Sequence, residues 1–287
     1  MLDLDPIHDF LASNARLLDR QRMELALGSG DREATLAVLA GHRNTDGGFD
    51  WALEPDSRAP TSQPVAALHA FEVFEEIAPA TSPLALGLLD WLDGIAADGG
   101  AVPFALPGGA TAGSAPMWGT ADTESPSLHM TCVVLSIAHR VARPEVAAHS
   151  WLRRATDWAR REIAALDGPR DAIEFSYVLQ LLDALEERDE LGRLGAHLPP
   201  DGTLAVTGGK PDEAMRPLDF SPEPGRPMRD LFESRTIEAD LDRLEAEQHD
   251  DGGWDVDWMH WSPAGGLEWR GWATVRAVRI LRANGRL

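Results

Sequence analysis

The sequence predicts an all-α protein, a single α/α-barrel (toroid) of helical hairpin repeats that spans residues 1–287 as one domain. Three observations lead to this fold class: Asp-Gly turns recur, segments with helical periodicity follow them, and enclosed helices alternate with half-exposed ones. Helices covered on both sides suit an inner ring, and helices covered on one side suit an outer ring. A superhelical solenoid would meet the same pattern, so periodicity alone leaves ring closure open.

The repeated turns are the first observation. The gaps between them fit a repeat of about fifty residues with one displaced turn, which is too long for tetratricopeptide or ankyrin arrays. Three of the five turns extend to Asp-Gly-Gly. The turns begin at Asp46, Asp98, Asp167, Asp201 and Asp251.

Helical periodicity and its sidedness are the other two observations. Apolar residues recur at near-helical spacing in the segment 65–77, and in the segment 125–141 we expect Ser125 as N-cap with Pro126 at the first helical position. Residues 130–138 are apolar on most sides and predict an enclosed helix. The segment 275–286 separates an arginine stripe from an apolar stripe and predicts a half-exposed helix. Further helices are expected over 7–27, 33–39, 84–95, 146–166, 173–185 and 236–248, and no strand is expected.

Composition limits the classes of partner. The formal charge of -21 at pH 7 would repel a phosphate backbone, so nucleic-acid binding is not expected. The chain has no apolar run of about eighteen residues and its first residues carry charges throughout, so we expect no membrane span, no secretory signal and a cytoplasmic protein. Cys132 is the only cysteine, which excludes an internal disulfide and a thiolate cluster. We expect no cofactor and no metal.

The segment 245–258, EAEQHDDGGWDVDW, resembles the Gln-Trp repeat of squalene-hopene and oxidosqualene cyclases, with Gln248 and Trp254 at the repeat positions. A fainter copy, GHRNTDGGFDW, has Phe49 in place of the tryptophan. The segments SQPVAALHAF and WRGWATVRAVRIL also resemble the way in which these cyclases, and the β subunits of protein prenyltransferases, begin an inner helix. The resemblance implies the α/α-barrel fold, a central apolar cavity, and a small apolar molecule as ligand, with isoprenoids as the implied class.

The sequence also departs from that family. Class II cyclases protonate an isoprenoid with a DxDD motif just before an inner helix, and the nearest match in that place is Asp122-Thr123-Glu124-Ser125. The zinc ligands of the prenyltransferases are not matched, because His129 and Cys132 lie on one short stretch without the required Asp. Full-length cyclases carry two such domains, and this chain has room for one.

Four carboxylates are candidates for chemistry. Protonating an alkene needs a carboxylic acid that is kept neutral and hydrogen-bonded in a dry pocket, and Asp122 with Glu124 is the expected catalytic pair. The alternative is that both occupy the polar approach to a helix and complement its dipole. Glu54 and Asp56 hold the equivalent place in the first repeat, and we expect them to contact substrate together with Trp118.

The chain has ten tryptophans and one tyrosine. Trp258, Trp261 and Trp269, expected in a loop, complete the substrate-binding candidates, because aromatic faces stabilise cations. Alternatively they tie outer helices together, which is the role expected for Trp254. The aspartates around Asp251 offer oxygens to Ca²⁺, although turn formation explains that residue without a metal.

The leading hypothesis is a terpene-cyclase-like enzyme that acts on an apolar, isoprenoid-type substrate by acid-initiated cyclisation. One alternative is a non-catalytic barrel that binds a ligand or partner, which the missing DxDD favours. Another is a carbohydrate-processing barrel, since carboxylates with tryptophan platforms also suit sugars.

Overall fold

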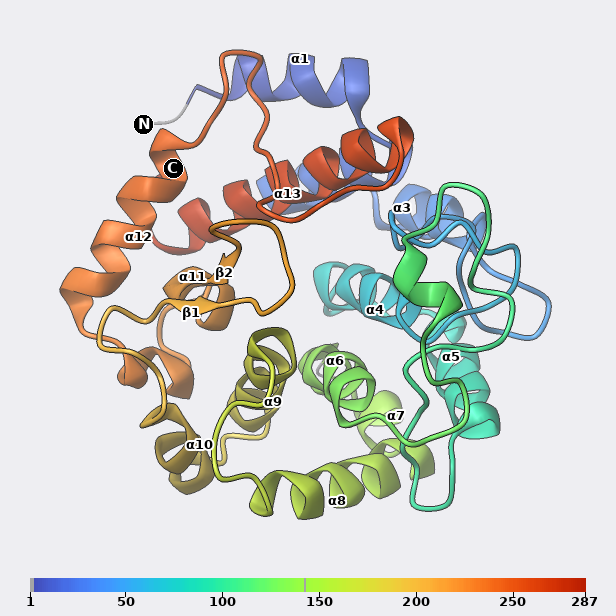
Figure 1. Cartoon of the computed structure of the whole chain (residues 1–287). Helices are drawn as coiled ribbons and strands as arrows, with labels where there is room; N and C mark the ends of the chain where they lie inside the picture. Colours follow the sequence, from blue (N-terminus) through green and yellow to red (C-terminus); the bar gives the residue numbers. More distant parts are fainter. Residues whose placement is uncertain (1–2, 142) are drawn as a thin grey trace. The chain divides into compact units, whose positions relative to one another are not determined.

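The computed structural model describes residues 3–141 and 143–287, and this part of the chain is predominantly helical, as predicted (Figure 1). It contains thirteen α-helices, three short 3-10 helices and one two-stranded antiparallel sheet. The chain divides into two compact units: unit 1 comprises Met1–Asp31 with Gly168–Leu287, and unit 2 comprises Arg32–Asp167. None of the described helices combines the length and the hydropathy that a bilayer span requires.

Unit 2 is built around two helices, α4 and α6, that pack against each other, with α3 and α5 against α4 and with α8 against both α5 and α6. Every residue from Met130 to Ala138 is buried, which confirms the enclosed helix predicted there. By contrast α8 buries one face and exposes its arginines on the other. The elements are α3 (Arg32–Ala40), α4 (Ala66–Glu76), α5 (Pro83–Ile95), η1 (Pro116–Gly119), α6 (Leu128–Ala138), η2 (His139–Val141), α7 (Pro144–Ala147) and α8 (Ser150–Ala164).

The start of α6 differs from the prediction. Its N-cap is Ser127, whose hydroxyl accepts a hydrogen bond from the Met130 N–H at 3.1 Å, and not Ser125. Pro126 lies before the helix and forms an isolated β-bridge with Pro103. The backbone N–H of Ser127 donates to the Val102 carbonyl at 3.0 Å, which keeps this stretch extended until the cap.

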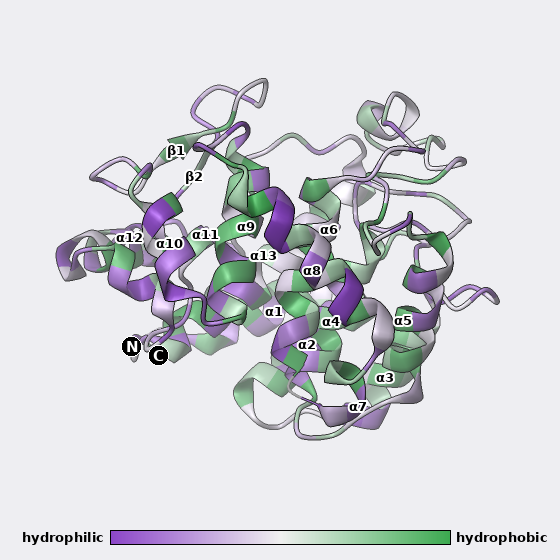
Figure 2. Ribbon diagram, turned by 90° about the horizontal axis from the view of Figure 1, so that it is seen from below, coloured by the Kyte–Doolittle hydropathy of each residue, from purple (hydrophilic) through white to green (hydrophobic). Residues whose placement is uncertain are grey.

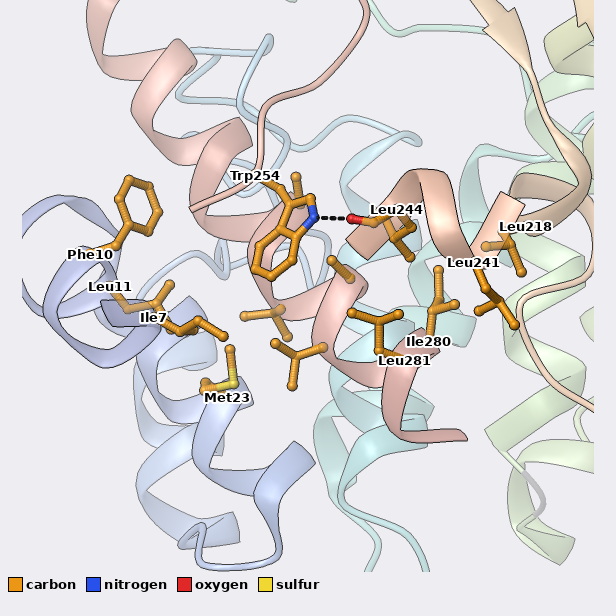
Figure 3. Packing of buried hydrophobic residues seen from close by; sticks show 14 of the residues in the cluster. Ile7, Phe10, Leu11, Met23, Leu218, Leu241, Leu244, Trp254, Ile280 and Leu281 are labelled. Carbon is orange, nitrogen blue, oxygen red and sulfur yellow. Dashed lines mark hydrogen bonds between the residues drawn. The ribbon is translucent and has the colours of Figure 1, made fainter. Parts of the chain in front are cut away.

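Unit 1 is organised by α13, a helix of 21 residues that packs against α1, α2 and α12. Its residues Val275, Val278 and Leu281 are fully buried in a core that also holds Trp254 (Figure 3), which confirms the predicted apolar stripe. Along α12, Figure 2 shows both hydrophilic and hydrophobic residues, as expected for a helix covered on one side. The elements are α1 (Leu4–Asn14), α2 (Leu17–Leu27), α9 (Ala172–Ala184), α10 (Arg188–Gly195), β1 (Leu204–Ala205), β2 (Ala214–Met215), α11 (Pro217–Phe220), η3 (Pro227–Leu231), α12 (Ser234–Ala246) and α13 (Pro263–Ala283).

Two predictions about unit 1 were wrong. The helix expected over 7–27 is two helices, because Ala15 and Arg16 have extended backbones (ψ 156° and 152°). The break places Ala15 against Gly271 of α13, where an added Cβ would lie 3.0 Å from the alanine Cβ. The absence of strands was also wrong, since β1 and β2 pair through Leu204 with Met215 and Ala205 with Ala214.

The first and last Asp-Gly turns share one backbone geometry. In turns 44–48 and 249–253, the first residue's N–H donates to the last residue's carbonyl at 2.9 Å. The fourth residue's N–H donates back to the first carbonyl at 3.1 Å and 2.8 Å, respectively. That fourth residue is a left-handed glycine in both turns, Gly47 (φ 100°) and Gly252 (φ 90°), a conformation that side chains disfavour. Two of the five turns predicted from sequence, the first and the last, therefore share one backbone geometry.

Candidate functional site

Loop 41–65 of unit 2, together with α4, gathers several ionisable side chains in the interior. Asp50, Glu54, Asp56 and His69 are 0%, 5%, 6% and 2% exposed, respectively. Ionisable groups at such burial need specific partners, and they cluster at functional sites more often than elsewhere. Glu54 and Asp56 were predicted from sequence, whereas Asp50 and His69 were not. We call these four residues the loop 41–65 cluster.

Asp50 is the completely buried member of this cluster. Its Oδ2 accepts a hydrogen bond from the Ser57 hydroxyl at 2.5 Å, and its Oδ1 accepts one from the Ala52 N–H at 3.2 Å. Burial raises the pKa of Asp50 to about 7, because the cost of desolvating the charged form exceeds the effect of these hydrogen bonds. Near neutral pH the neutral carboxylic acid is therefore accessible to Asp50, unlike to an ordinary exposed aspartate.

His69 lies between two carboxylates. Its Nε2 is 2.9 Å from Glu54 Oε2, and its Nδ1 is 3.0 Å from Glu72 Oε2. Burial alone would lower the pKa of His69, but the charges of Glu72 and Glu54 and their hydrogen bonds raise it to about 9. At neutral pH His69 is therefore an imidazolium that donates to both carboxylates and fixes the orientation of Glu54.

Three predicted substrate-binding residues meet in this region. The Glu54 Oε1 accepts a hydrogen bond from the Asp56 N–H at 3.2 Å. The Asp56 carbonyl in turn accepts from the Trp118 indole N–H at 2.9 Å and from the Ala115 N–H at 2.8 Å. The structure thus brings Glu54, Asp56 and Trp118 together, and Trp118 is buried with its ring stacked on Phe104.

The backbone beside Asp50 is strained. Trp51 (φ 54°) and Ala52 (φ 60°) are successive non-glycine residues in the left-handed region. The Trp51 N–H donates to the Ala59 carbonyl at 3.1 Å, and its indole N–H donates to Asn44 Oδ1 at 2.8 Å. These two left-handed residues turn the chain back on itself, so that the Ser57 hydroxyl reaches Asp50.

The predicted acid pair, Asp122 and Glu124, lies at the surface and not in the buried cluster. Asp122 and Glu124 are exposed, and Asp122 Oδ1 accepts the N–H groups of Glu124 at 2.9 Å and Ser125 at 3.0 Å. Hydrogen bonds from the Ser125 side chain and backbone, and then from Glu124, lower the pKa of Asp122 to about 2. An exposed, ionised carboxylate is the opposite of a neutral acid in a dry pocket, so the geometry does not support Asp122 as proton donor. Within the described residues, neither side chain bonds to the loop 41–65 cluster.

The remaining tryptophan candidates belong to unit 1. Trp258 lines a pocket of about 440 Å³, and its ring contacts Trp269 edge to face with centroids 5.0 Å apart. Trp269 was expected in a loop but lies within α13, because Ser262 caps that helix and Pro263 begins it. Trp261 is 43% exposed at the surface and is not part of the pocket lining.

Trp254 has the structural role that was predicted for it. It is buried, and its indole N–H donates to the Leu244 carbonyl of α12 at 2.7 Å (Figure 3). This hydrogen bond and the surrounding core tie the last turn to its neighbouring helices.

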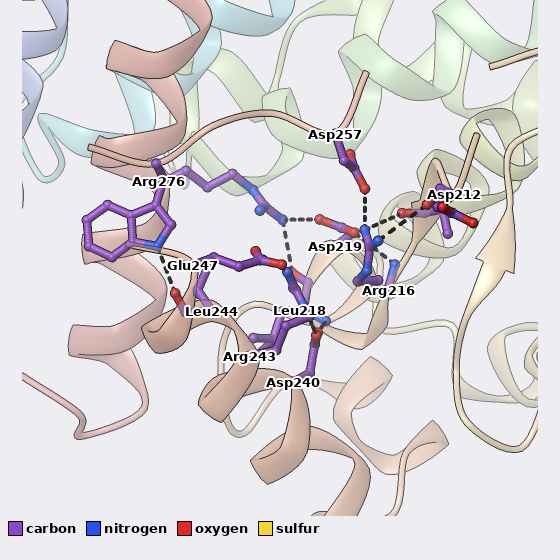
Figure 4. Close-up of polar contacts among 12 residues, drawn as sticks. Asp212, Arg216, Leu218, Asp219, Asp240, Arg243, Leu244, Glu247, Asp257 and Arg276 are labelled. Carbon is purple, nitrogen blue, oxygen red and sulfur yellow. Dashed lines mark hydrogen bonds and ion pairs between the residues drawn. The ribbon is translucent and has the colours of Figure 1, made fainter. Parts of the chain in front are cut away.

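The aspartates that follow the last turn are paired with arginines. Arg270 donates to both carboxylate oxygens of Asp251 at 2.9 Å, and its Nε lies 2.6 Å from Asp255. Asp257 pairs with Arg216 (Figure 4). Within residues 3–141 and 143–287, no group of three or more His, Cys, Asp or Glu side chains is arranged to hold a metal ion. The calcium alternative thus gains no support from this cluster.

Comparison with known proteins finds a solved structure with a similar fold but no matching family. No protein-family model matches the chain, and no curated protein matches it either. A solved structure described as a protein from Actinoplanes is similar to it, with a TM-score of 0.55 and 13% sequence identity over 96% of this chain and 97% of that one. At this identity the similarity shows that the two chains share a fold over almost their entire lengths.

Proposed function

We propose that the chain is a terpene-cyclase-like enzyme of the α/α-barrel type, which starts the cyclisation of an apolar, isoprenoid-type substrate by donating a proton. The proposed acid is Asp50. One observation carries this proposal: the carboxyl of Asp50 is fully buried, which raises its pKa to about 7, in the loop that also holds Glu54 and Asp56.

The surroundings of Asp50 suit a proton donor. An alkene is a weak base, so its protonation needs a neutral acid whose conjugate base is stabilised once the proton has left. The hydroxyl of Ser57 and the N–H of Ala52 already donate to the two carboxyl oxygens and would stabilise that carboxylate. Low solvent exposure also protects a carbocation from water.

His69 acts in this proposal as a positioning residue. Its imidazolium holds Glu54 by a 2.9 Å hydrogen bond, and the charge of Glu54 contributes to the raised pKa of Asp50. Removing the imidazole would therefore change how strongly Asp50 holds its proton without removing the acid itself.

Access to Asp50 requires movement of loop 41–65, because the carboxyl is fully buried. The strained residues Trp51 and Ala52 lie directly beside it and are the proposed hinge. Trp51 is 52% exposed, and such an opening would break the hydrogen bond from its indole N–H to Asn44 Oδ1.

The test is incubation with a panel of linear terpenes and prenyl diphosphates in D₂O. Acid-initiated cyclisation places one solvent deuteron on a carbon of the product, which mass spectrometry detects. We expect Asp50→Asn to abolish cyclisation, and Asp122→Asn to retain it. The matched control is Asp255→Asn, which removes the aspartate at the same place after the last turn.

Two outcomes would contradict the proposal. Cyclisation by Asp50→Asn at the wild-type rate would exclude Asp50 as the acid. A cyclised product without solvent deuterium would exclude protonation as the first step. Circular dichroism of each variant separates loss of activity from loss of fold.

A further inference from the structure

We propose that the pocket between loop 255–260 and the first turns of α13 binds a small organic anion with an apolar body, and that the Lys210 ammonium pairs with its anionic group. This site lies in unit 1 and shares no residue with the loop 41–65 cluster of unit 2. It therefore stands independently of the proposed proton transfer.

The shape of the pocket suits a small molecule. Its volume of about 440 Å³ falls within the range of about 300–1,000 Å³ that is usual for ligand sites. One wall is a single face of α13, since its residues recur every three or four positions. At Gly266 an added Cβ would lie 3.2 Å from the His260 ring, so the loop lies close to the helix here. The lining comprises Lys210, Asp255, Val256, Trp258, Met259, His260, Pro263, Gly266, Leu267 and Arg270.

The apolar part of the lining is open to solvent. Met259 is 50% exposed and Leu267 is 42% exposed, so a bound apolar body would remove both from water. Trp258 adds a rigid surface, because Trp269 and Trp272 hold its ring with centroids 5.0 Å and 6.1 Å away. This part of the site would bind an alkyl chain or a small ring.

Among the charged residues of the lining, the Lys210 ammonium is not paired with a carboxylate in the described part of the chain. Arg270 is committed to Asp251 and Asp255, and Asp255 also lies 3.2 Å from His249. Among the described residues Lys210 forms no ion pair, and only its backbone N–H contacts a carboxylate, that of Glu213 at 2.9 Å. An anionic ligand would supply the missing partner, which is why we choose an anion over a cation.

Lys210 is also the only lysine in the chain, where every other basic side chain is an arginine. A lysine ammonium is a compact charge on a flexible stem and can follow an anionic group, whereas Arg270, the arginine of the same lining, is held in ion pairs with Asp251 and Asp255. The uniqueness of this residue makes the proposal directly testable by amine chemistry.

The first experiment is calorimetric titration of the full chain with four octyl compounds. Octanoate and octyl phosphate are the anionic probes, octanol is the neutral probe and octylammonium is the cationic one. We expect both anions to bind more tightly than the other two, and the comparison of the two anions tells whether the site prefers a carboxylate or a phosphate. Lys210→Gln should weaken the anions about fivefold and leave octanol unchanged.

One control variant preserves the positive charge at position 210, and the other removes a positive charge elsewhere in unit 1. Lys210→Arg keeps the cation and should retain anion binding. Arg235→Gln removes one positive charge from α12, where that side chain is 83% exposed, and should have no effect. Asp50→Asn should also bind the anions normally, so a failure of this proposal is distinguishable from a failure of the proposed enzyme.

The second experiment uses acetylation of Lys210, followed by mass spectrometry of its peptide. Saturating octanoate should slow acetylation of Lys210, whereas octanol should not. Equal anion affinity in Lys210→Gln and the wild type, tighter binding of octylammonium than of octanoate, or no protection of Lys210 would each overturn the proposal.

Discussion

The turn at 46–50 in unit 2 and the turn at 251–255 in unit 1 have nearly the same sequence, Asp-Gly-Gly-Phe-Asp and Asp-Gly-Gly-Trp-Asp. Their backbone hydrogen bonds match, and Phe49 and Trp254 are both buried. The next residue differs in its chemistry. Asp50 is enclosed and its pKa is about 7, whereas the Asp255 side chain is 55% exposed and pairs with Arg270. The repeat thus sets the backbone, and residues outside the turn set the surroundings of the aspartate that follows it.

The first aspartate of each turn likewise has one contact that is the same in both turns and one that differs. Asp46 and Asp251 both accept the N–H of the second glycine, at 3.0 Å and 3.1 Å, respectively. The other partner of Asp46 Oδ1 is the Ser62 hydroxyl at 2.8 Å, whereas Asp251 is held by Arg270. Local contacts within the turn are repeated, and contacts outside it are not.

The largest effect is expected from removing the buried aromatic residue of each turn. Trp254→Ala should lower the free energy of unfolding by about 4 kcal/mol, because it opens a cavity and leaves the Leu244 carbonyl without its donor. Phe49→Ala should cost about 3 kcal/mol, since a smaller ring is lost. Urea unfolding measures both values. A loss below ~1 kcal/mol for either variant would show that its turn is not anchored by the ring.

The glycines at the fourth position of the turns should respond unequally. At Gly252 an added Cβ would lie 2.2 Å from the Pro6 carbonyl oxygen, while at Gly47 the nearest atom, the Gly87 carbonyl oxygen, is 3.0 Å away. Gly252→Ala should therefore cost more than ~3 kcal/mol and Gly47→Ala about 1–2 kcal/mol. Thermal unfolding of the pair tests this order. Equal losses would mean that backbone conformation alone sets the cost.

The pH dependence of stability should report the protonation of Asp50. The pKa of Asp50 is raised in the folded state, so the native protein binds more protons, and stability should fall as pH rises from about 4 to about 7. Asp50→Asn should remove about 3 kcal/mol of that decline. Unfolding free energies at pH 4, 5.5 and 7 measure the slope. An unchanged slope in this variant would show that folding does not raise the pKa of Asp50.

The smallest effect is expected from Asp255→Asn. Its ion pair with Arg270 is partly exposed, and such pairs contribute less than ~1 kcal/mol. The variant should match the wild type in urea at pH 7, and raising the salt concentration should remove most of any difference. A larger loss would indicate that the carboxylate of Asp255 organises the pocket wall.

The sequence was informative about local structure and less so about contacts. The enclosed helix α6 and the apolar stripe of α13 could be predicted because periodicity reports burial of a single helix. The split between α1 and α2 could not, because it depends on how Ala15 fits against Gly271 more than two hundred residues later.

The residues of the candidate site also divide into those that a local sequence pattern indicates and those that depend on the folded backbone. Glu54, Asp56 and Trp118 were proposed from sequence because carboxylates and an aromatic residue precede predicted helices, and the structure brings the three together. Asp50 was missed because its burial and its Ser57 partner depend on the backbone reversal at Trp51. One signal was available, since Asp50 and Asp255 hold the same place after the two matching turns.

The composition of unit 1 also bears on how the protein is made. Its helices α1 and α2 precede unit 2 in the sequence and pack against α13, which follows unit 2. Unit 2 is continuous in sequence and ends at Asp167, so all of its helices are available to pack while translation continues. We therefore expect unit 2 to fold before α13 is synthesised, while α1 and α2 have not yet met that helix.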